Sequence, residues 1–409
     1  MLWILLHGRG GSSSQSELYV SPMDSSRALV QHIAVFGESG SGKTVLLSSF
    51  YGATQESQYL KKNLFHLVAD DIGQGSRLYR NYLGMRDSAR LPEANRFSAT
   101  PYSFSVKLRT GSKPKAAKSR PFEVLRLVWH DYPGEWFEQN VSGPEEANRR
   151  VETFRSLLRS DVALVLVDGQ RLLDNAGKEE RYLKSLLTNL RNGLLSLESD
   201  LLQDGKPLVQ FPRIWMLALS KSDLLPKLDV FGFRDILIGK AGDEIDELRK
   251  VIAGLVEGGD ALSVGEDFVL LSSAKFGTRR IELTERVGLE LILPVAAILP
   301  FERKVRWAYA KHIPRKVAER LLDGAADLAA AMAGSKAPVG GPLGVLLKLV
   351  GSVISKEVIA EMAKLAGDKL KEANAEALAR HDYLAATLTR FQLDLDAGEE
   401  EQILLRSLR

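Results

Sequence analysis

The stretch that decides the fold of this 409-residue chain is Gly37-Glu38-Ser39-Gly40-Ser41-Gly42-Lys43-Thr44. It fits the pattern G-x-x-x-x-G-K-[ST] at every position. The short apolar run Ile33–Phe36 leads into it, and apolar residues at helical spacing follow from Val45. The order strand, glycine-rich loop, helix is the context in which this motif forms a phosphate-binding loop.

Each residue type in this loop has a chemical reason to be there. Glycines let the backbone N–H groups wrap around phosphate oxygens, and the N-terminus of the following helix adds positive potential. We expect Lys43 to reach the β and γ phosphates of a nucleotide and the Thr44 hydroxyl to ligate Mg²⁺. A glycine-rich turn without a ligand is the alternative, and the Lys-Thr pair argues against it.

Buried strands and helices alternate after this loop. Continuous apolar runs predict strands at Val162–Val167, Ile214–Leu219 and Phe268–Leu271, and helices are expected at about 144–159, 177–200 and 242–256. Alternating polar and apolar residues predict an antiparallel strand pair at Tyr102–Leu108 and Phe122–Trp129. The pattern predicts the α/β class, with a mostly parallel sheet covered on both faces plus one antiparallel pair.

The chain divides into three predicted parts. Residues 1–29 are expected to be a flexible leader, and residues 30–288 the α/β domain, with a helical insertion at about 51–99 in which no clear strand is expected. Residues 289–409 lack strand signals and favour helix, which predicts a helical C-terminal domain.

Composition excludes several functional classes. The 45% hydrophobic and 26% charged residues are typical of a globular protein, and the chain has no cysteine for disulfides or thiolate metal sites. Six histidines without paired spacing argue against a zinc enzyme, and a net charge of +3 gives no reason to expect nucleic acid. No charge-free apolar run of about 18 residues occurs. We therefore expect a cytoplasmic protein, with peripheral contact to the inner membrane left open.

Three later stretches end predicted strands and bear on the base of the nucleotide. Asp131-Tyr132-Pro133-Gly134 has the form D-x-x-G, in which the Asp holds Mg²⁺ through water and the Gly N–H meets a γ-phosphate. In Ser220-Lys221-Ser222-Asp223, the carboxylate of Asp223 can accept from the two donors of guanine, which adenine lacks, while the Lys221 stem covers the base. In Ser272-Ser273-Ala274-Lys275, a backbone N–H can contact guanine O6.

Taken together, residues 31–275 resemble a P-loop GTPase of the translation-factor-related (TRAFAC) class. The run Asp131–Trp136 is further similar to the YcjX-like, stress-associated bacterial GTPases. The resemblance implies GTP or GDP with Mg²⁺ as ligands. The residues expected to bind the nucleotide are Gly37, Glu38, Ser39, Gly40, Ser41, Gly42, Lys43, Thr44, Ser220, Lys221, Asp223, Ser273, Ala274 and Lys275.

The resemblance also implies residues that act in hydrolysis. Thr100, just before the predicted antiparallel strand, is expected to close over Mg²⁺ beside Thr44 and Asp131; an ordinary strand-entry threonine is the alternative. With Lys43 and Gly134, the residue after that glycine completes the expected catalytic set, and here it is Glu135. A carboxylate accepts a hydrogen bond from water but repels a γ-phosphate, so slow intrinsic hydrolysis accelerated by a partner or by self-association is expected. Alternatively, Glu135 faces solvent or caps a helix.

Three functions remain open on the sequence alone. The preferred one is a GTP-hydrolysing switch, the second a non-hydrolysing nucleotide-bound module whose helical tail binds a partner or a membrane, and the third an ATPase. The tail holds a basic segment, Glu302–Arg320, expected to be a solvated helix face, and an apolar stripe from Leu343 to Leu365. We expect the stripe to pack on the protein's own core, with protein partner binding, self-association or membrane contact as alternatives.

Overall fold

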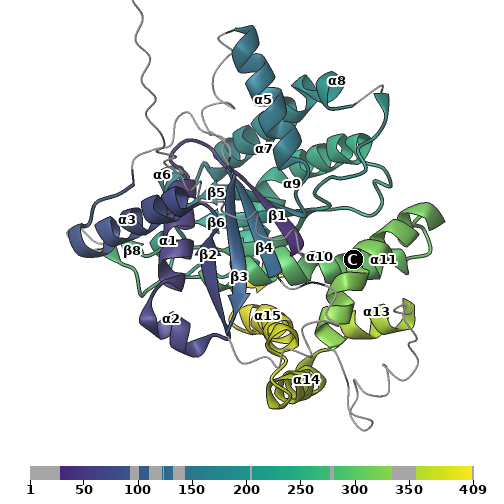
Figure 1. Ribbon diagram of the computed structural model, residues 1–409. Helices are drawn as coiled ribbons and strands as arrows, with labels where there is room; N and C mark the ends of the chain where they lie inside the picture. Colours follow the sequence, from purple (N-terminus) through teal and green to yellow (C-terminus); the bar gives the residue numbers. More distant parts are fainter. Residues whose placement is uncertain are drawn as a thin grey trace, which may run out of the picture.

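The sheet is built around the strand that leads into Gly37–Thr44. The computed structural model describes residues 28–92, 101–109, 122, 124–131, 143–202, 205–276, 281–333 and 356–407. Strand β1 (Ala28–Phe36) lies between β4 (Val124–Asp131) and β5 (Val162–Asp168), parallel to both. The eight strands follow the order β10-β7-β6-β5-β1-β4-β3-β2 (Figure 1). The others are β2 (Phe65–Ala69), β3 (Tyr102–Leu108), β6 (Ile214–Ser220), β7 (Ser263–Leu270) and β10 (Leu404–Leu405).

The directions of the strands confirm the predicted fold class. β4, β1, β5, β6 and β7 are parallel to their neighbours within that group, and β3 is antiparallel to β4 with Tyr102 opposite Trp129. The two edge strands β2 and β10 are also antiparallel to their neighbours. The carboxyl ends of the five parallel strands therefore meet at one edge, which is where open α/β sheets bind ligands.

Helices cover both faces of the sheet because its central strands are apolar on both sides. In β1, Ile33 and Val35 belong to one cluster of buried residues, and Ala34 and Phe36 belong to the other. The first cluster is completed by α1 (Lys43–Thr54), α10 (Ile292–Ala308), α11 (Arg315–Ala333), α13 (Lys356–Ala363), α14 (Gly367–Ala379) and α15 (Tyr383–Glu400). The second contains α5 (Pro144–Leu157), α7 (Glu179–Ser196) and α9 (Val230–Leu255).

Short elements complete the described chain. They are α2 (Ser57–Lys62), α3 (Ile72–Ser88), α6 (Gly169–Asp174), α8 (Glu198–Leu201), the strand pair β8 (Lys275–Phe276) and β9 (Ile281–Glu282), and two 3₁₀ turns at Ser222–Leu224 and Leu289–Leu291. No helix in the described ranges is both long and apolar enough to cross a bilayer.

Four elements differ from the sequence predictions. The segment 51–99 contains a strand, β2, so the expectation that it holds none is wrong; β3 supplies the pairing partner that the local pattern does not reveal. Helix α9 begins at Val230, twelve residues earlier than predicted, and only its part after a break at Ala241 was expected. Strand β7 begins at Ser263 rather than Phe268, and the helical C-terminal region ends in the short strand β10.

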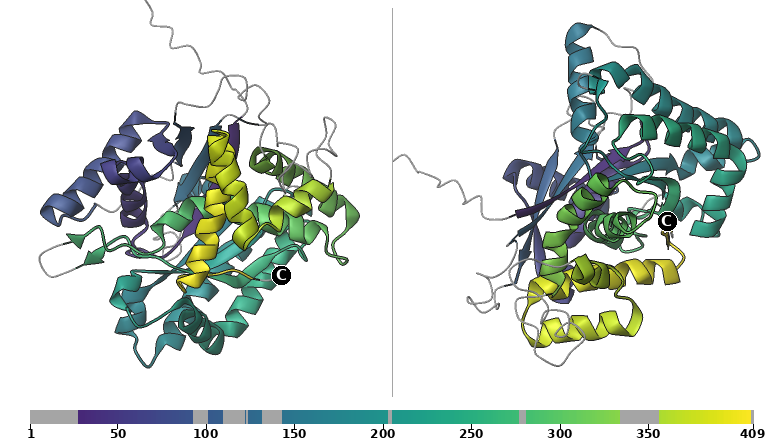
Figure 2. Two further views of the ribbon diagram at one scale, coloured as in Figure 1. Left: turned by 90° about the horizontal axis from the view of Figure 1, so that it is seen from below. Right: turned by 90° about the vertical axis from the view of Figure 1, so that its right-hand side faces the viewer.

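The helical C-terminal region shares a hydrophobic core with the sheet. Helix α10 packs directly on β1 and β5, and Figure 2 shows the yellow helices α14 and α15 beside it. Buried residues on both sides of position 288 therefore belong to one cluster, and the division at this position stays a prediction. The predicted leader lies outside the described residues except for its last two, which open β1.

The basic segment Glu302–Arg320 is solvated over most of its length, as expected, because five of its basic residues are exposed: Arg306, Lys311, Arg315, Lys316 and Arg320. Two of its residues depart from that expectation. Trp307 is buried, and the side chain of Arg303 is 1% exposed because its guanidinium pairs with Asp267 of β7 at 2.5 Å. Of the apolar stripe, residues 334–355 lie outside the described residues. Val358, Met362 and Leu365 are buried in the core, as expected for that part.

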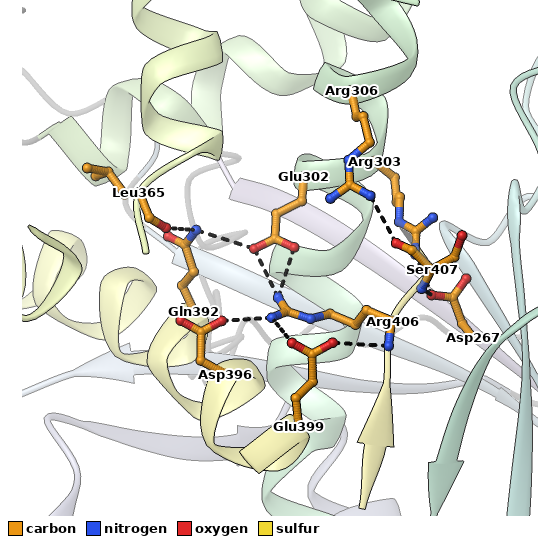
Figure 3. A network of polar contacts seen from close by, with 10 residues as sticks. All are labelled: Asp267, Glu302, Arg303, Arg306, Leu365, Gln392, Asp396, Glu399, Arg406 and Ser407. Carbon is orange, nitrogen blue, oxygen red and sulfur yellow. Dashed lines mark hydrogen bonds and ion pairs between the residues drawn. The ribbon is translucent and has the colours of Figure 1, made fainter. Parts of the chain in front are cut away.

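Buried ion pairs also fix the C-terminal segment to α10 and α15 (Figure 3). The guanidinium of Arg406 contacts three carboxylates, at 3.1 Å from Glu302, 2.7 Å from Asp396 and 2.5 Å from Glu399. The next residue, Ser407, donates its backbone N–H to Asp267 at 2.9 Å. This set of contacts, which we call the C-terminal clasp, holds β10 against β7.

Candidate functional site

The loop Gly37–Thr44 has the backbone geometry of a phosphate-binding loop. Gly40 and Gly42 have φ angles of 81° and 89°, a region that favours glycine, and α1 begins directly after them at Lys43. A Cβ atom on Gly37 would lie 2.6 Å from the Ser41 Oγ and 3.1 Å from Leu166 of β5. Three glycines are thus required by turn geometry or by close packing, as the motif predicts.

Side chains inside the loop face polar backbone groups. The ammonium of Lys43 donates to the carbonyl oxygens of Gly37 at 2.7 Å and Glu38 at 3.2 Å. The hydroxyl of Ser41 is buried and has no hydrogen-bond partner within the described parts of the chain. A cation and an O–H donor are therefore held at the mouth of the helix, where an anion binds best.

The end of β5 supplies two ion pairs that no motif predicted. Asp168 is almost fully buried and pairs with the ammonium of Lys221 at 2.8 Å, which holds the lysine stem near Gly42. Three residues further on, Arg171 of α6 pairs with the buried carboxylate of Glu38 and donates to the Ser39 carbonyl at 3.2 Å. One polar strand end thus supports both the glycine-rich loop and the Ser220–Asp223 loop. The position of Asp168, at the end of a buried strand, was the signal available in the sequence.

Asp223 connects the two loops that were expected to read the base. Its carboxylate accepts from the Ser272 hydroxyl at 2.7 Å and from the backbone N–H of Phe276 at 3.4 Å. Lys221 has a positive φ of 54°, which turns the chain sharply between β6 and the Ser222–Leu224 turn. Ala274 is buried, whereas Lys275 is exposed and pairs with Glu285 at 2.8 Å.

A cavity of about 270 Å³ joins the predicted elements. Its walls come from the glycine-rich loop, α1, the start of α6, and the ends of β6 and β7. The lining residues are Gly40, Ser41, Gly42, Val45, Leu46, Leu91, Gln170, Ser220, Lys221, Leu224, Leu271, Ser273 and Phe276. Six of the residues predicted to bind nucleotide line this space, and Gln170, Leu224 and Phe276 are among the additions that no motif indicated.

Two of the three residues expected to hold a divalent cation, Thr44 and Asp131, fit that role by their chemistry and place. Asp131 is the last residue of β4 and lies opposite Val35 of β1, so its carboxylate is at the same sheet edge as the glycine-rich loop. Thr44 is the second residue of α1. Carboxylate and hydroxyl oxygens are the hard ligands that Mg²⁺ prefers. Thr100, Gly134 and Glu135 lie outside the described residues.

Two buried groups beside this edge remain uncharged at neutral pH. Burial and the neighbouring His32 lower the pKa of His130 to about 4, and the two imidazoles contact each other with Nδ1 of His32 3.0 Å from Nε2 of His130. Burial raises the pKa of Tyr182, whose oxygen accepts from the Asp168 N–H at 2.8 Å. The charges at this edge therefore come from the lysines, arginines and carboxylates described above.

Comparison with known proteins agrees with this geometry. Residues 31–203 match the model of the Double-GTPase 2 family, a match over less than half of the chain. It supports a P-loop GTPase in this part of the protein, while the finer likeness to YcjX-like proteins stays a prediction. A comparison with the curated proteins gives no match.

The solved structures that match this chain have low sequence identity and low TM-scores. A probable GTP-binding protein, engB, is 12% identical, with 63% of this chain and 92% of that chain covered and a TM-score of 0.23. The cytosolic domain of the T. maritima FeoB iron transporter in a GDP form is 10% identical, with 84% and 99% covered and a TM-score of 0.26. Scores this low carry no conclusion about this chain.

Proposed function

We propose that this protein binds GTP with Mg²⁺ and hydrolyses it to GDP and phosphate, with slow intrinsic turnover, as a nucleotide-dependent switch. The observation that carries the proposal is the 270 Å³ cavity, which joins the glycine-rich loop to Ser220, Lys221 and Ser273 from two distant strand ends. A phosphate loop alone does not distinguish ATP from GTP. The Asp223 carboxylate, fixed between Ser272 and Phe276, supplies the acceptor that guanine requires.

The roles of the residues follow from their positions. Backbone N–H groups of Gly40–Gly42 and the ammonium of Lys43 would bind the phosphates, and Gly134 would contact the γ-phosphate. Thr44, Asp131 and Thr100 would hold Mg²⁺, which when bound neutralises charge on the phosphates. The Lys221 stem, held by Asp168, would cover the base, and Ser220, Ala274 and Lys275 would complete the base-binding loops. Glu135 would position the attacking water weakly, which is the reason to expect slow turnover.

The C-terminal helices are the proposed output of the switch. Helix α10 packs on β1, the strand that leads into the glycine-rich loop, so a change in that loop has a direct path to the helices. We propose that a protein partner or a second copy of this chain binds at these helices. A cytoplasmic location, with peripheral contact to a membrane, is part of the same proposal.

The proposal is tested by hydrolysis of radiolabelled GTP with Mg²⁺, in the presence of excess unlabelled GTP or ATP. Turnover that GTP suppresses and ATP leaves unchanged supports a GTPase. Equal suppression by ATP indicates an ATPase, and stoichiometric GTP binding without turnover indicates a non-hydrolysing module; either result overturns the proposed activity.

Asp223→Asn is expected to reduce the preference for GTP over ATP by about 10- to 100-fold, the range of one paired hydrogen-bond contact to a base. The asparagine amide replaces one of the two carboxylate acceptors by a donor, which faces a donor of guanine. Competition of GDP and ADP for a fluorescent GDP analogue measures the change. Asp235→Asn, the same substitution at an exposed carboxylate of α9, is the control and should leave the preference unaltered. An unchanged preference in Asp223→Asn would remove this residue from base recognition.

Arg171→Ala is expected to weaken GDP binding about 10-fold, the range of one charge-assisted hydrogen bond. The substitution removes the guanidinium that neutralises buried Glu38 and supports the Ser39 carbonyl, so negative charge increases beside the phosphate site. A double variant, Arg171→Ala with Glu38→Gln, should recover most of the affinity because the buried charge is gone. If the double variant binds GDP no better than Arg171→Ala, charge at Glu38 is not the cause.

A further inference from the structure

A second cavity, of about 480 Å³, lies at the end of the sheet opposite the proposed nucleotide site. Its walls come from β1, the residues just before β5 and β6, and helices α10 and α11. These are the amino ends of the parallel strands, whereas the glycine-rich loop follows the carboxyl end of β1. Its volume is within the range of cavities that bind small molecules.

Cations outnumber carboxylates around this cavity. Arg159, Arg213, Lys304 and Arg320 line it, against the carboxylate of Asp161. Lys304 pairs with Asp161 at 3.2 Å, and Arg320 pairs with Glu257, which is not in the lining. The net charge of the wall therefore remains positive even after both ion pairs are counted.

Two of these cations keep their charge available. Arg213 donates to the carbonyl oxygens of Gly258 and Ala261 at 3.0 Å, and neutral carbonyls leave its positive charge uncancelled. Burial lowers the pKa of Arg213; the carboxylate of Glu257 opposes this shift, and nearby Arg320 adds a smaller contribution in the direction of burial. Arg159 is exposed, and the described residues give its side chain no hydrogen-bond or ion-pair partner.

A buried hydroxyl belongs to one of the residues that line the cavity. Ser160 is 2% exposed, lines the cavity, and its Oγ has no hydrogen-bond partner in the portion of the chain described. A buried O–H group without a partner costs free energy unless a ligand or water accepts from it. The lining also contains buried apolar residues, among them Phe211, Trp307 and Leu321.

We propose that this cavity binds a small organic anion with an aromatic body, its charged group on Arg159, Arg213 and Ser160 and its ring against Trp307 and Phe211. The arrangement is independent of the nucleotide site, so the proposal stands whether or not the chain hydrolyses GTP. Charge complementarity selects an anion, and the mixed lining selects one that is partly apolar rather than an inorganic ion.

The test uses two fluorescent probes on the full chain with saturating GDP and Mg²⁺. 8-Anilinonaphthalene-1-sulfonate has the required anion and rings, and N-phenyl-1-naphthylamine has the same rings without the sulfonate. We expect the sulfonate to bind about 10-fold more tightly than the amine, the range of one charge-assisted contact. A higher salt concentration should weaken the binding of the sulfonate probe and leave the binding of the amine probe unchanged.

Variants assign the binding to this cavity. Arg159→Glu should weaken sulfonate binding about 10-fold and Ser160→Ala about 3-fold, with the neutral amine unaffected. Arg149→Glu, an exposed arginine of α5 outside the cavity, is the matched control. Gly324 lines the cavity, and a Cβ on it would lie beside the Lys304 ammonium. Gly324→Leu should therefore fill part of the cavity and weaken the binding of both probes.

Two results would overturn the proposal. One is equal affinity for the two probes. The other is sulfonate binding that is unchanged in both Arg159→Glu and Gly324→Leu, which would place the probe elsewhere. Circular dichroism and thermal unfolding of each variant show whether a loss of binding reflects a loss of fold.

Discussion

Arg406→Ala is expected to lower the free energy of unfolding by about 3 kcal/mol, because breaking a buried ion pair leaves charge without compensation. In this variant three carboxylates, Glu302, Asp396 and Glu399, lose the guanidinium that they share (Figure 3). The charged form of Glu302 is destabilised most, because its side chain is 9% exposed, whereas that of Asp396 is 28% exposed and that of Glu399 is 36% exposed. Urea unfolding followed by circular dichroism measures the change.

The defect should depend on pH in a defined direction. Burial already raises the pKa of Glu302, and Arg406 opposes that rise. Removing Arg406 raises the folded-state pKa further above the unfolded value, so the folded variant binds a proton more tightly than the unfolded chain does. The loss of stability relative to the wild type should therefore be smaller at pH 5 than at pH 8.

A surface arginine of α15 provides the control for this experiment. Arg390 pairs with Asp394 at 2.8 Å, and its side chain is 65% exposed. Arg390→Ala should cost at most about 1 kcal/mol, because only one carboxylate, that of Asp394 with a 23% exposed side chain, loses its partner. If Arg406→Ala is no less stable than Arg390→Ala at pH 8, the C-terminal clasp does not contribute to stability.

The clasp also shows which parts of the fold could not be predicted from sequence. β5 and β6 were predicted within one residue because Val162–Val167 and Ile214–Leu219 are continuous apolar runs, buried on both faces. The first half of β7 was missed because it includes Gly265 and Asp267. Asp267 is buried there with its carboxylate bound by Ser263 of the same strand and by Arg303 and Ser407, which are far away in the sequence. Local periodicity has no information about such partners.

The candidate site also has parts that a local motif indicates and parts that depend on residues far apart in the sequence. The backbone of the glycine-rich loop agrees with its motif because the requirements of that motif are local: glycines with positive φ and a helix start within eight positions. The Ser220–Asp223 and Ser272–Lys275 loops were placed by the rule that strand ends meet at one sheet edge. The pairs Asp168–Lys221 and Arg171–Glu38 join segments 53 and 133 residues apart, and no short motif encodes them.

Lys43→Ala is expected to reduce GTP turnover by about 100-fold or more, comparable to removing one preorganised donor to a developing charge. The ammonium lies within hydrogen-bond distance of the carbonyl oxygens of Gly37 and Glu38, so it is held at the loop where phosphates would bind. Alanine removes the only side-chain cation inside the motif. Single-turnover hydrolysis of radiolabelled GTP, at protein concentrations above the nucleotide, measures the loss of rate separately from product release.

GDP binding and thermal stability must both be measured for Lys43→Ala, because the Lys43 ammonium also donates hydrogen bonds to two carbonyl oxygens of its own loop. Lys62→Ala, at an exposed lysine of α2, is the matched control and should hydrolyse GTP at the wild-type rate. Lys43→Ala should unfold within a few degrees of the wild type, since a partly exposed hydrogen bond to backbone contributes about 1 kcal/mol. A variant that folds, binds GDP and still hydrolyses GTP at the wild-type rate would show that the observed turnover does not arise in this loop.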